Sequence, residues 1–579
     1  MLGAHVHSGA VEFRVWAPKY NLLSVEVNGS EAVELQRDQA GVFSGTAEAK
    51  AGDRYCYVLG DKRLPDPVSR HLPEGVHGRT EIVDPRAFAW SDKRWRGLAF
   101  EDYVLYELHV GTFSPAGTFD GVIPKLDYLR DLGITAIEIM PVAAFPGQRN
   151  WGYDGVSLYA VQASYGGPEG LKRLVDAAHR VGLAVVLDVV YNHVGAEGNY
   201  LREFGSYFTD RYHTVWGDAI NYDDQGCEQV RSYVVENALY WVREYHIDGL
   251  RLDAIQAIHD SSRINIVKEL VRAVQQFAQA SNRRICVIAE SDQNDRNLIL
   301  PLAEGGFGLD AVWSDDFHHS VHTLLTGEKR GYYQDFGEPE KIVKALNEGF
   351  VFQGQHFRFW RASRGTSADG IPLPRHVFCI QNHDQVGNRC FGERLHHIVP
   401  RGAIKAAAAL LLLAPQTPLL FMGEEYAEPA AFQFFTDYGD KHLQDAVVEG
   451  RKKEFEDFGW EDMPNPQDPA TFERSKLSWQ MDNEMLAWYK QLLELRRKFV
   501  VRTSRTCHAY LSHRKIVVEM PAETRSLVLR VHFPGTPVQQ SDEEIDRRAL
   551  LHSDEDGYTV AIVENQSAAQ TLEAQERIA

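Results

Sequence analysis

Short runs in which apolar and polar residues alternate open the chain. Val11–Trp16, Leu23–Val27 and Tyr55–Leu59 have this period of two, and turn-forming residues separate them. Alternation of this kind is typical of strands with one buried face. We therefore predict an N-terminal β-sandwich over residues 1–95.

From residue 96 onward, eight short apolar runs alternate with amphipathic helical stretches. The runs are Val104–Val110, Ala136–Val142, Ala184–Val190, Gly249–Ile255, Ile285–Glu290, Ala311–Phe317, His376–Asp384 and Thr417–Glu425. The helical stretches include Gly170–Val181, Val230–Tyr245 and Ile264–Ala278, and a helix at Met485–Lys498 follows the last run. This alternation predicts a (β/α)8 TIM barrel over residues 96–498. A doubly wound open sheet is the alternative, but the Gly-rich turn typical of that fold does not follow the first run.

The remaining apolar segments predict a second β domain and a buried helix followed by a buried strand. Lys515–Glu519, Ser526–Val531 and Tyr558–Val563 alternate again, which indicates a small C-terminal β domain over 499–579. The most apolar stretch, Ala406–Met422, is broken by Pro415 and is too short to span a bilayer core of about 30 Å. We expect it to form a buried helix followed by a buried strand.

Composition narrows the possible partners and the compartment. The 579 residues include 61 Lys and Arg against 81 Asp and Glu, a net charge of −20. Such a chain is repelled by phosphate backbones and anionic lipid, so we expect no nucleic-acid or membrane partner. Six widely spaced cysteines without a C-x-x-C pair predict reduced, buried thiols. The first residues show no basic segment followed by an apolar run, so we expect a cytoplasmic protein.

Polar residues gather where the predicted barrel strands end. The segments are Asp188–His193, Arg251–Asp253, Ala289–Glu290, Asp315–His319, Asn382–Asp384 and Gly423–Glu425. Barrel enzymes carry their active sites at the carboxyl ends of the strands. Because buried carboxylates are costly without a purpose, this cluster indicates a catalytic site.

Three carboxylates suit chemistry on a sugar. Arg251 and Asp253 lie two apart on one strand and face the same side, so Arg251 keeps Asp253 ionised as a nucleophile requires. Glu290 follows an apolar run, and partial desolvation raises the pKa of such a carboxyl toward that of a general acid. Asp384 can stabilise positive charge on the ring. Two carboxylates about 5 Å apart give double displacement with retention.

Other interpretations of single residues stay open. Any one of these carboxylates could form a structural ion pair or a helix cap. A metal site using His193, His318, His319 and His383 is a second alternative, but these residues lie on different strands without a metal-binding spacing. Trp151 and Tyr153 could stack on a pyranose, although a packed loop aromatic is an equal interpretation of Trp151.

Four blocks resemble the sequence regions of the α-amylase family, glycoside hydrolase family 13. They are Asp188–His193, Gly249–Ala254, Ile288–Glu290 and Asn382–Asp384, in the expected order. The resemblance implies that Asp253 is the nucleophile, Glu290 the acid/base and Asp384 the transition-state stabiliser. It also implies substrate contacts from Tyr153, Asp154, His193, Arg251, His383, Gln385 and Asn388, with Tyr153 stacked on the reacting glucose.

Further segments resemble one branch of this family along the chain to about residue 500. They are Tyr212–Tyr222, Trp313–His319, Ile380–Arg389 and Glu449–Phe455. The branch implies hydrolysis of the α-1,4 bond next to the terminal trehalose unit of maltooligosyltrehalose. The candidate trehalose contacts are Asp315, Asp316, His318 and His319. A glycogen branching enzyme and a non-catalytic glucan-binding protein are the alternatives.

The same resemblance bears on cofactors and partners. Asn192 is a metal ligand in amylases, but its partner ligands are not evident here, so we expect neither a metal nor another cofactor. The expected ligands are maltooligosyltrehalose and maltooligosaccharides, and the expected functional partner is a maltooligosyltrehalose synthase. The opening Phe13–Pro18 is similar to that of glycogen branching and debranching relatives, and the N-terminal domain is expected to resemble a carbohydrate-binding module.

Overall fold

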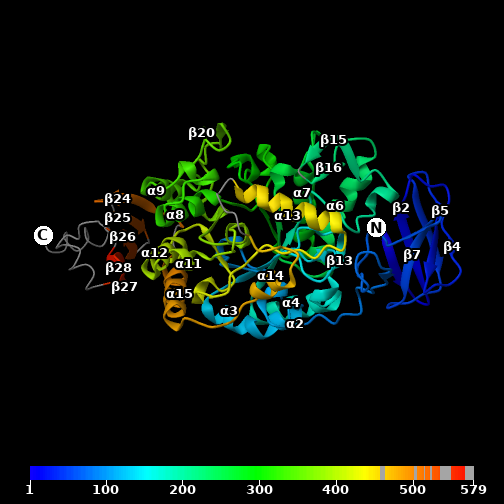
Figure 1. The fold of residues 1–579 in the computed structure, drawn as a ribbon, viewed down its shortest axis with the longest axis horizontal. Helices are drawn as coiled ribbons and strands as arrows, with labels where there is room; N and C mark the ends of the chain where they lie inside the picture. The colour runs from blue at the N-terminus through cyan, green and yellow to red at the C-terminus, as the bar shows by residue number, and fades with distance from the viewer. Residues whose placement is uncertain are drawn as a thin grey trace.

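A closed barrel of eight parallel strands forms the centre of the computed structural model (Figure 1). The structure describes residues 1–214, 216–456, 463–500, 505–513, 515–521, 525–534 and 549–566. The barrel strands are β10 (Leu105–Leu108), β11 (Ala136–Ile139), β14 (Ala184–Val189), β17 (Gly249–Leu252), β18 (Cys286–Ala289), β19 (Ala311–Trp313), β22 (His376–Cys379) and β23 (Thr417–Phe421). Each lies within one of the eight predicted runs, so the TIM barrel is confirmed.

The strands end earlier than the apolar runs predicted, because the polar residues that follow them begin loops or helices. Asp315 is the clearest case, since it starts a helix instead of ending the sixth strand. The longer helices around the barrel are α3 (Leu126–Leu132), α4 (Gly167–Val181), α6 (Cys227–Glu244), α7 (Ile266–Ser281), α8 (Asp315–Thr326), α9 (Pro339–Glu348), α12 (Arg401–Leu412), α13 (Lys441–Glu456), α14 (Pro469–Arg474) and α15 (Asn483–Leu495). Short helices are α1 (Val110–Phe113), α2 (Phe119–Val122), α5 (Leu201–Phe204), α10 (His383–Gly387) and α11 (Leu395–Ile398).

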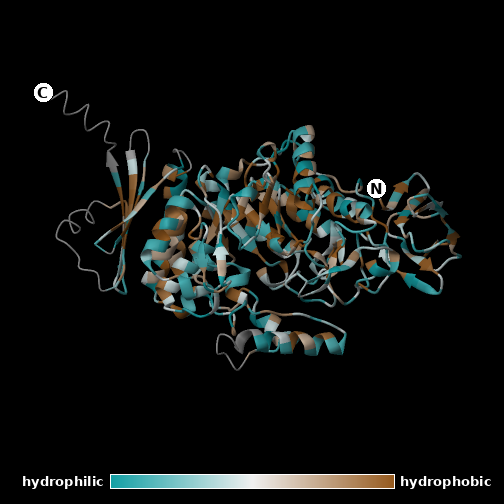
Figure 2. Ribbon diagram, turned by 90° about the horizontal axis from the view of Figure 1, so that it is seen from above, coloured by the Kyte–Doolittle hydropathy of each residue, from teal (hydrophilic) through white to brown (hydrophobic). Residues whose placement is uncertain are grey.

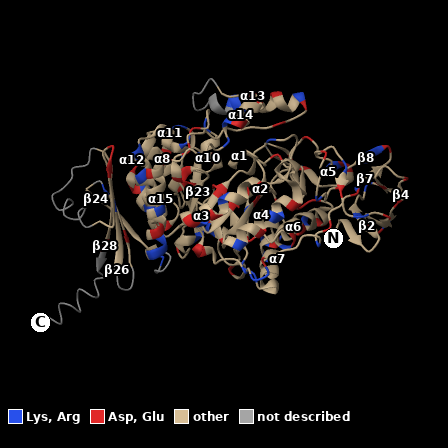
Figure 3. Ribbon diagram, turned by 90° about the horizontal axis from the view of Figure 1, so that it is seen from below, with Lys and Arg blue, Asp and Glu red and all other residues tan. Residues whose placement is uncertain are grey.

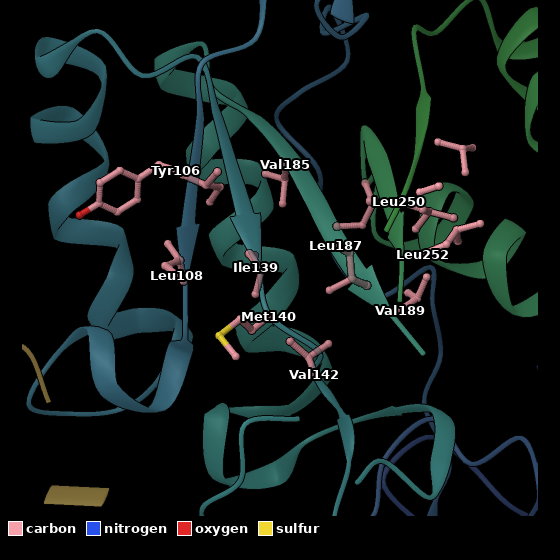
Figure 4. Close-up of a cluster of buried hydrophobic side chains, with 14 of the residues drawn as sticks. Tyr106, Leu108, Ile139, Met140, Val142, Val185, Leu187, Val189, Leu250 and Leu252 are labelled. Atoms are coloured by element: carbon pink, nitrogen blue, oxygen red, sulfur yellow. The ribbon is translucent and has the colours of Figure 1, made fainter. Parts of the chain in front are cut away.

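Side chains alternate between the inside of the barrel and its helix-facing side. Leu187, Leu250 and Leu252 belong to the large apolar core that the strands share with the surrounding helices (Figure 4). Ile288 and Trp313 belong to a separate apolar cluster formed by the alternate strand positions. Apolar residues are concentrated in the central strands in Figure 2. The alternation matters because it turns Arg251, between Leu250 and Leu252, to the inside.

Antiparallel sheets lie at both ends of the molecule's long axis (Figure 1). The N-terminal strands are β1 (Gly3–His7), β2 (Ala10–Trp16), β3 (Ser24–Val27), β4 (Val33–Glu34), β5 (Gln36–Arg37), β6 (Val42–Ala47), β7 (Arg54–Leu59), β8 (Lys62–Leu64) and β9 (Thr80–Glu81). They form two sheets, β1-β2-β6-β5 and β4-β3-β7-β8, with β9 paired to β7. The C-terminal sheet has the order β24-β25-β26-β28-β27. Its strands are β24 (His508–Ser512), β25 (Lys515–Met520), β26 (Arg525–His532), β27 (Leu551–Glu555) and β28 (Tyr558–Gln566).

The C-terminal sheet is fastened to the start of α12. The amide N–H of Gly402 donates to Oδ2 of Asp556 at 3.0 Å, and Lys405 pairs with Glu555 at 2.7 Å. Since the residue before α12, Pro400, offers no side-chain cap, Asp556 supplies one from the neighbouring domain.

The predicted buried helix and strand at 406–422 are found, and the prediction of buried thiols holds for four of the six cysteines. Helix α12 and strand β23 account for the apolar segment at 406–422, and their residues are almost all buried. All six cysteines are free, although Cys227 and Cys507 are half-buried and not fully buried as predicted. Within the ranges given above, every helix is too short or too polar to cross a membrane.

Candidate active site

Arg251 holds together the carboxylates at the ends of three neighbouring strands. Its guanidinium is 1% exposed. Nη1 donates to both oxygens of Asp188, at 2.9 and 2.8 Å, and to Oδ1 of Asp253 at 2.8 Å. Nη2 lies 3.1 Å from Oε2 of Glu290. Asp253 and Glu290 therefore lie side by side on one cation, at the carboxyl end of the barrel.

Asp253 is also oriented by the neighbouring strand end. The amide nitrogen Nδ2 of Asn192 donates at 2.8 Å to Oδ2 and to the main-chain oxygen of Asp253. With Arg251 on its other oxygen, this carboxylate is fixed from both sides. A carboxylate held in one orientation beside a buried cation is suited to nucleophilic attack.

Glu290 has the properties of a general acid. Burial raises the pKa of its carboxyl to about 8, the nearby Arg251 opposes this shift, and the charges of Asp253 and Asp384 add to it. Oε2 accepts the N–H of Ala254 at 2.6 Å. At neutral pH the group therefore carries a proton that it can donate.

Asp384 lies on α10, a single turn that follows β22. The side chain of Asn382 caps this turn by accepting the N–H of Gln385 at 2.7 Å. The amide of Asn388 donates to Oδ1 of Asp384. Asp384 and Glu290 line the same cavity, so all three predicted carboxylates meet at one end of the barrel.

His383 and Tyr153 pack against each other beside these carboxylates. Glu107, inside β10, accepts both the main-chain N–H and Nδ1 of His383. Burial lowers the pKa of His383, but the Glu107 carboxylate outweighs it and the net direction is upward. The Tyr153 hydroxyl lies 2.8 Å from Nε2 of His383 and donates to Asp188 at 2.7 Å, and its ring stacks on the imidazole.

Two more predicted residues, His193 and Asp154, lie near Tyr153. His193 is bonded through Nε2 to the main-chain oxygen of Tyr153 at 2.9 Å, and its ring stacks on exposed Trp216 at 4.3 Å. Burial lowers the pKa of His193. Asp154 accepts Nδ2 of Asn150 at 2.6 Å. Both residues therefore shape the loop that carries Tyr153.

A cavity of about 290 Å³ extends from Glu290 and Asp384 toward the loops after β19. Its lining contains Asp315, His319, Gln385 and Asn388 from the predicted set. The residues that the sequence interpretation missed are Gln256, Asp292, Glu328, Tyr332, Tyr333, Phe357, Phe359, Trp360, Arg364 and Arg389. Three of these ten, Phe357, Phe359 and Trp360, belong to the aromatic-rich stretch 350–360, and for them that density of aromatic residues was the available signal.

Eight of the predicted substrate contacts do not line this cavity. Five of them lie around the carboxylates, as described above: Tyr153, Asp154, His193, Arg251 and His383. The other three are packed inside the protein. Asp316 is fully buried and pairs with Arg364 at 2.9 Å while accepting main-chain N–H groups of residues 351 and 352. His318 packs behind His319, within 3.1 Å of its Nδ1. Because α8 is a helix, successive residues point in different directions, so Asp315 and His319 face the cavity while these two do not.

The third is Trp151, which the sequence allowed to be either a sugar-stacking ring or a packed loop aromatic. It is 4% exposed, donates to the main-chain oxygen of Gln433 at 3.0 Å and packs edge-on against His383. A Cβ atom on Gly387 would lie 2.1 Å from its ring. Trp151 is therefore a packed aromatic that lies against residues 383 and 387 of α10.

The described residues are expected to hold no metal ion at this site. Among the residues that the structure describes, three or more His, Cys, Asp or Glu side chains are nowhere grouped as a metal ion requires. Asn192 is engaged with Asp253, as described above. The expectation of a metal-free site stays a prediction.

Comparison with known proteins finds sequences and folds similar to this chain among carbohydrate-active enzymes. The model of the alpha-amylase catalytic domain matches residues 82–221. A malto-oligosyltrehalose trehalohydrolase from Saccharolobus solfataricus is 44% identical over 569 residues, covering 95% of this chain and 99% of that protein. A crystal structure from Salmonella typhimurium, described as an alpha-amylase candidate, has a TM-score of 0.88 at 38% identity and covers 98% of this chain and 99% of that one. A 1,4-alpha-glucan branching enzyme from Jannaschia sp. is 31% identical over 74% of this chain, which spans 64% of that enzyme.

Proposed function

The chain belongs to the malto-oligosyltrehalose trehalohydrolases of the α-amylase family, and from this premise we propose the reaction that it performs. It is a glycoside hydrolase that cleaves the α-1,4 bond next to the terminal trehalose unit of maltooligosyltrehalose. The products are free trehalose and a shorter maltooligosaccharide. The observation that carries this proposal is the single guanidinium of Arg251 against both Asp253 and Glu290, at a cavity that Asp384 also lines.

The proposed mechanism is a retaining double displacement. Protonated Glu290 donates its proton to the glycosidic oxygen while Asp253 attacks the anomeric carbon, and trehalose leaves. Asp384 stabilises the positive charge that develops on the ring. A water molecule, deprotonated by Glu290, then hydrolyses the bond to Asp253 and releases the maltooligosaccharide with its anomeric configuration retained.

The remaining groups act by orientation and recognition in this proposal. Tyr153 and His383, beside the carboxylates, would lie under the reacting glucose. Asp315, His319, Gln385 and Asn388 line the cavity that would receive the trehalose part. The aromatic rings of the stretch 350–360, with Phe359 half exposed, would offer apolar faces to the leaving disaccharide.

Product analysis on two substrates tests the proposal. Incubation with maltotetraosyltrehalose should release free trehalose, with one new reducing end for each trehalose and with the α-anomer formed first. The variant Asp253→Ala should lose about four orders of magnitude in kcat while still binding the substrate. A branching enzyme would instead change the iodine staining of amylose without new reducing ends. Binding without any turnover would indicate a glucan-binding protein.

The cellular setting and the domain limits belong to the same proposal. Free thiols at all six cysteines suit a reducing, cytoplasmic compartment. A maltooligosyltrehalose synthase would supply the substrate there. We also keep the division into a sandwich of residues 1–95, a catalytic barrel of 96–498 and a C-terminal β domain of 499–579, of which several segments lie outside the described residues.

A further inference from the structure

Helix α13 (Lys441–Glu456) lies outside the barrel. Figure 3 shows it projecting at one edge of the molecule. The side chains of residues 441–453 are exposed or half-exposed, and none of them is buried. An isolated helix of this length is marginally stable in water, so specific contacts must fix its place.

Arg451 makes such contacts, and they lead toward the active site. Its Nη1 donates to Oδ1 of Asn388 at 2.7 Å, and Nη2 reaches the main-chain oxygen of Gly387 at 3.4 Å. The guanidinium also lies over the ring of Phe434, 4.7 Å from its centre. The side chain of Arg451 thus connects α13 to the end of α10.

Asn388 passes this contact on to Asp384. An asparagine amide has one end that accepts and one end that donates, whereas a guanidinium only donates. Arg451 therefore requires Oδ1 of Asn388 to face it, which leaves the NH2 group facing Asp384, where it donates to Oδ1. The reversed amide would set two donors against each other on one side and two acceptors on the other.

We propose that Arg451 is a positioning residue for Asp384, because it locks the amide of Asn388 in the one orientation that donates to that carboxylate. The inference rests on the proposed function only in that Asp384 must serve α-glucoside cleavage. It gives the outer helix a part in catalysis without any contact to the reacting atoms. In this inference the main role of Asn388 is to orient Asp384, and its contact with the sugar is secondary.

Kinetics of matched variants test this inference. Arg451→Met keeps the packing over Phe434 but removes the donor, so kcat should fall by about 10–100-fold with KM changed less than about twofold, as expected for a small misplacement of a catalytic group. Arg451→Lys keeps one donor and should recover part of the loss. Lys452→Met is the control, because Lys452 lies on the same helix and pairs with Glu449 at 3.0 Å on the exposed side. It should behave as wild type.

A double-mutant cycle separates positioning from support of the fold. If Arg451 acts through Asn388, then Arg451→Met should add less than about twofold to the loss caused by Asn388→Ala. Additive losses, a rise in KM alone, or a wild-type kcat in Arg451→Met would each overturn the inference. The ratios are measured on whichever reaction the wild type performs, trehalose release or amylose conversion. Absence of trehalose release therefore counts against the proposed function and leaves the test of Arg451 intact.

Discussion

Arg251 sets the electrostatics of the centre at the scale of single residues. It is buried, and its guanidinium charge is shared by Asp188, Asp253 and Glu290. One cation cannot fully compensate three carboxylates in a desolvated site, so at least one of them tends to hold a proton. Glu290 is the group whose pKa rises to about 8, while the pKa of Asp188 rises to about 6. The arrangement thus separates an acid from a nucleophile.

The pH dependence of activity should report this acid. Because only protonated Glu290 can donate, kcat/KM should be flat through neutral pH and should fall as the pH rises through about 8. The measurement is trehalose release from maltotetraosyltrehalose between pH 5 and 10. Glu290→Gln should lose most of the activity at every pH and show no such basic limb. A wild-type basic limb centred below pH 6 would contradict the assignment.

Substitutions of two adjacent residues on α8 should have different effects, one on substrate binding and the other on the stability of the fold. Asp315 lines the cavity, whereas Asp316 forms a buried ion pair with Arg364. We expect Asp315→Asn to raise KM several-fold with little change in unfolding. Asp316→Asn leaves a buried guanidinium without its partner, which costs about 3–5 kcal/mol and should lower the unfolding midpoint. Equal effects of the two variants on KM would contradict the placement of these residues.

Among the elements, the short helix α10 depends on its support. It presents His383, Asp384 and Gln385 within a single turn. Asn382 caps it, and Trp151 packs beneath it so closely that residue 387 has no room for a side chain. A turn this short has little stability of its own, so its position follows the aromatic ring below it.

Gly387→Ala should therefore disturb catalysis more than folding. The new Cβ would meet Cζ2 of Trp151 at 2.1 Å, so α10 must move by a fraction of an ångström or more. We expect kcat to fall by about 100-fold, with a modest drop in Tm, because catalytic groups tolerate little displacement. Gly450→Ala on α13 is the control, since a Cβ there meets nothing within 4 Å. A wild-type kcat in Gly387→Ala would show that α10 does not need this packing.

The same elements show how far sequence reasoning extends. All eight barrel strands could be predicted because strands buried on both faces read as short apolar runs. Their ends could not, since the polar residues 314–316 do not show whether the strand continues or stops, and in the structure a helix begins at Asp315. The three carboxylates lie in local motifs, whereas Glu107 is 276 positions from His383 and looks like an isolated charge in an apolar run. Contacts of that separation depend on the closure of the barrel.

For the whole molecule, the joint between the N-terminal sheets and the barrel is an internal ion network. His179 of α4 is bonded at 2.8 Å to Asp92, in the segment that joins the two parts, and at 2.8 Å to Asp248, which precedes β17. Trp95 of the same segment stacks on His179 and donates to Asp248 at 2.8 Å. The buried imidazole of His179 is therefore one of the groups that fasten the linking segment to the barrel, together with Asp176, which accepts from Ser91, and His246, which is bonded to Asp92.

The charge of His179 should make the stability of the protein depend on pH. Burial lowers the pKa of this imidazole, but the bonds to Asp248 and Asp92 outweigh burial and the net direction is above 6.5. A group whose pKa is raised by folding stabilises the folded state fully below its unfolded pKa, near 6.5, and this contribution is lost as the pH rises through the folded pKa. His179→Gln should thus lower Tm most at pH 6, and the difference from wild type should shrink toward pH 9. Because the Tm of the variant is subtracted from that of wild type at each pH, the pH dependence that Glu290 and other groups give to both proteins cancels. His213→Gln on the surface, where the side chain is 75% exposed, should leave the curve unchanged. A difference between wild type and His179→Gln that stays constant from pH 6 to 9 would mean that the imidazole acts through neutral hydrogen bonds alone.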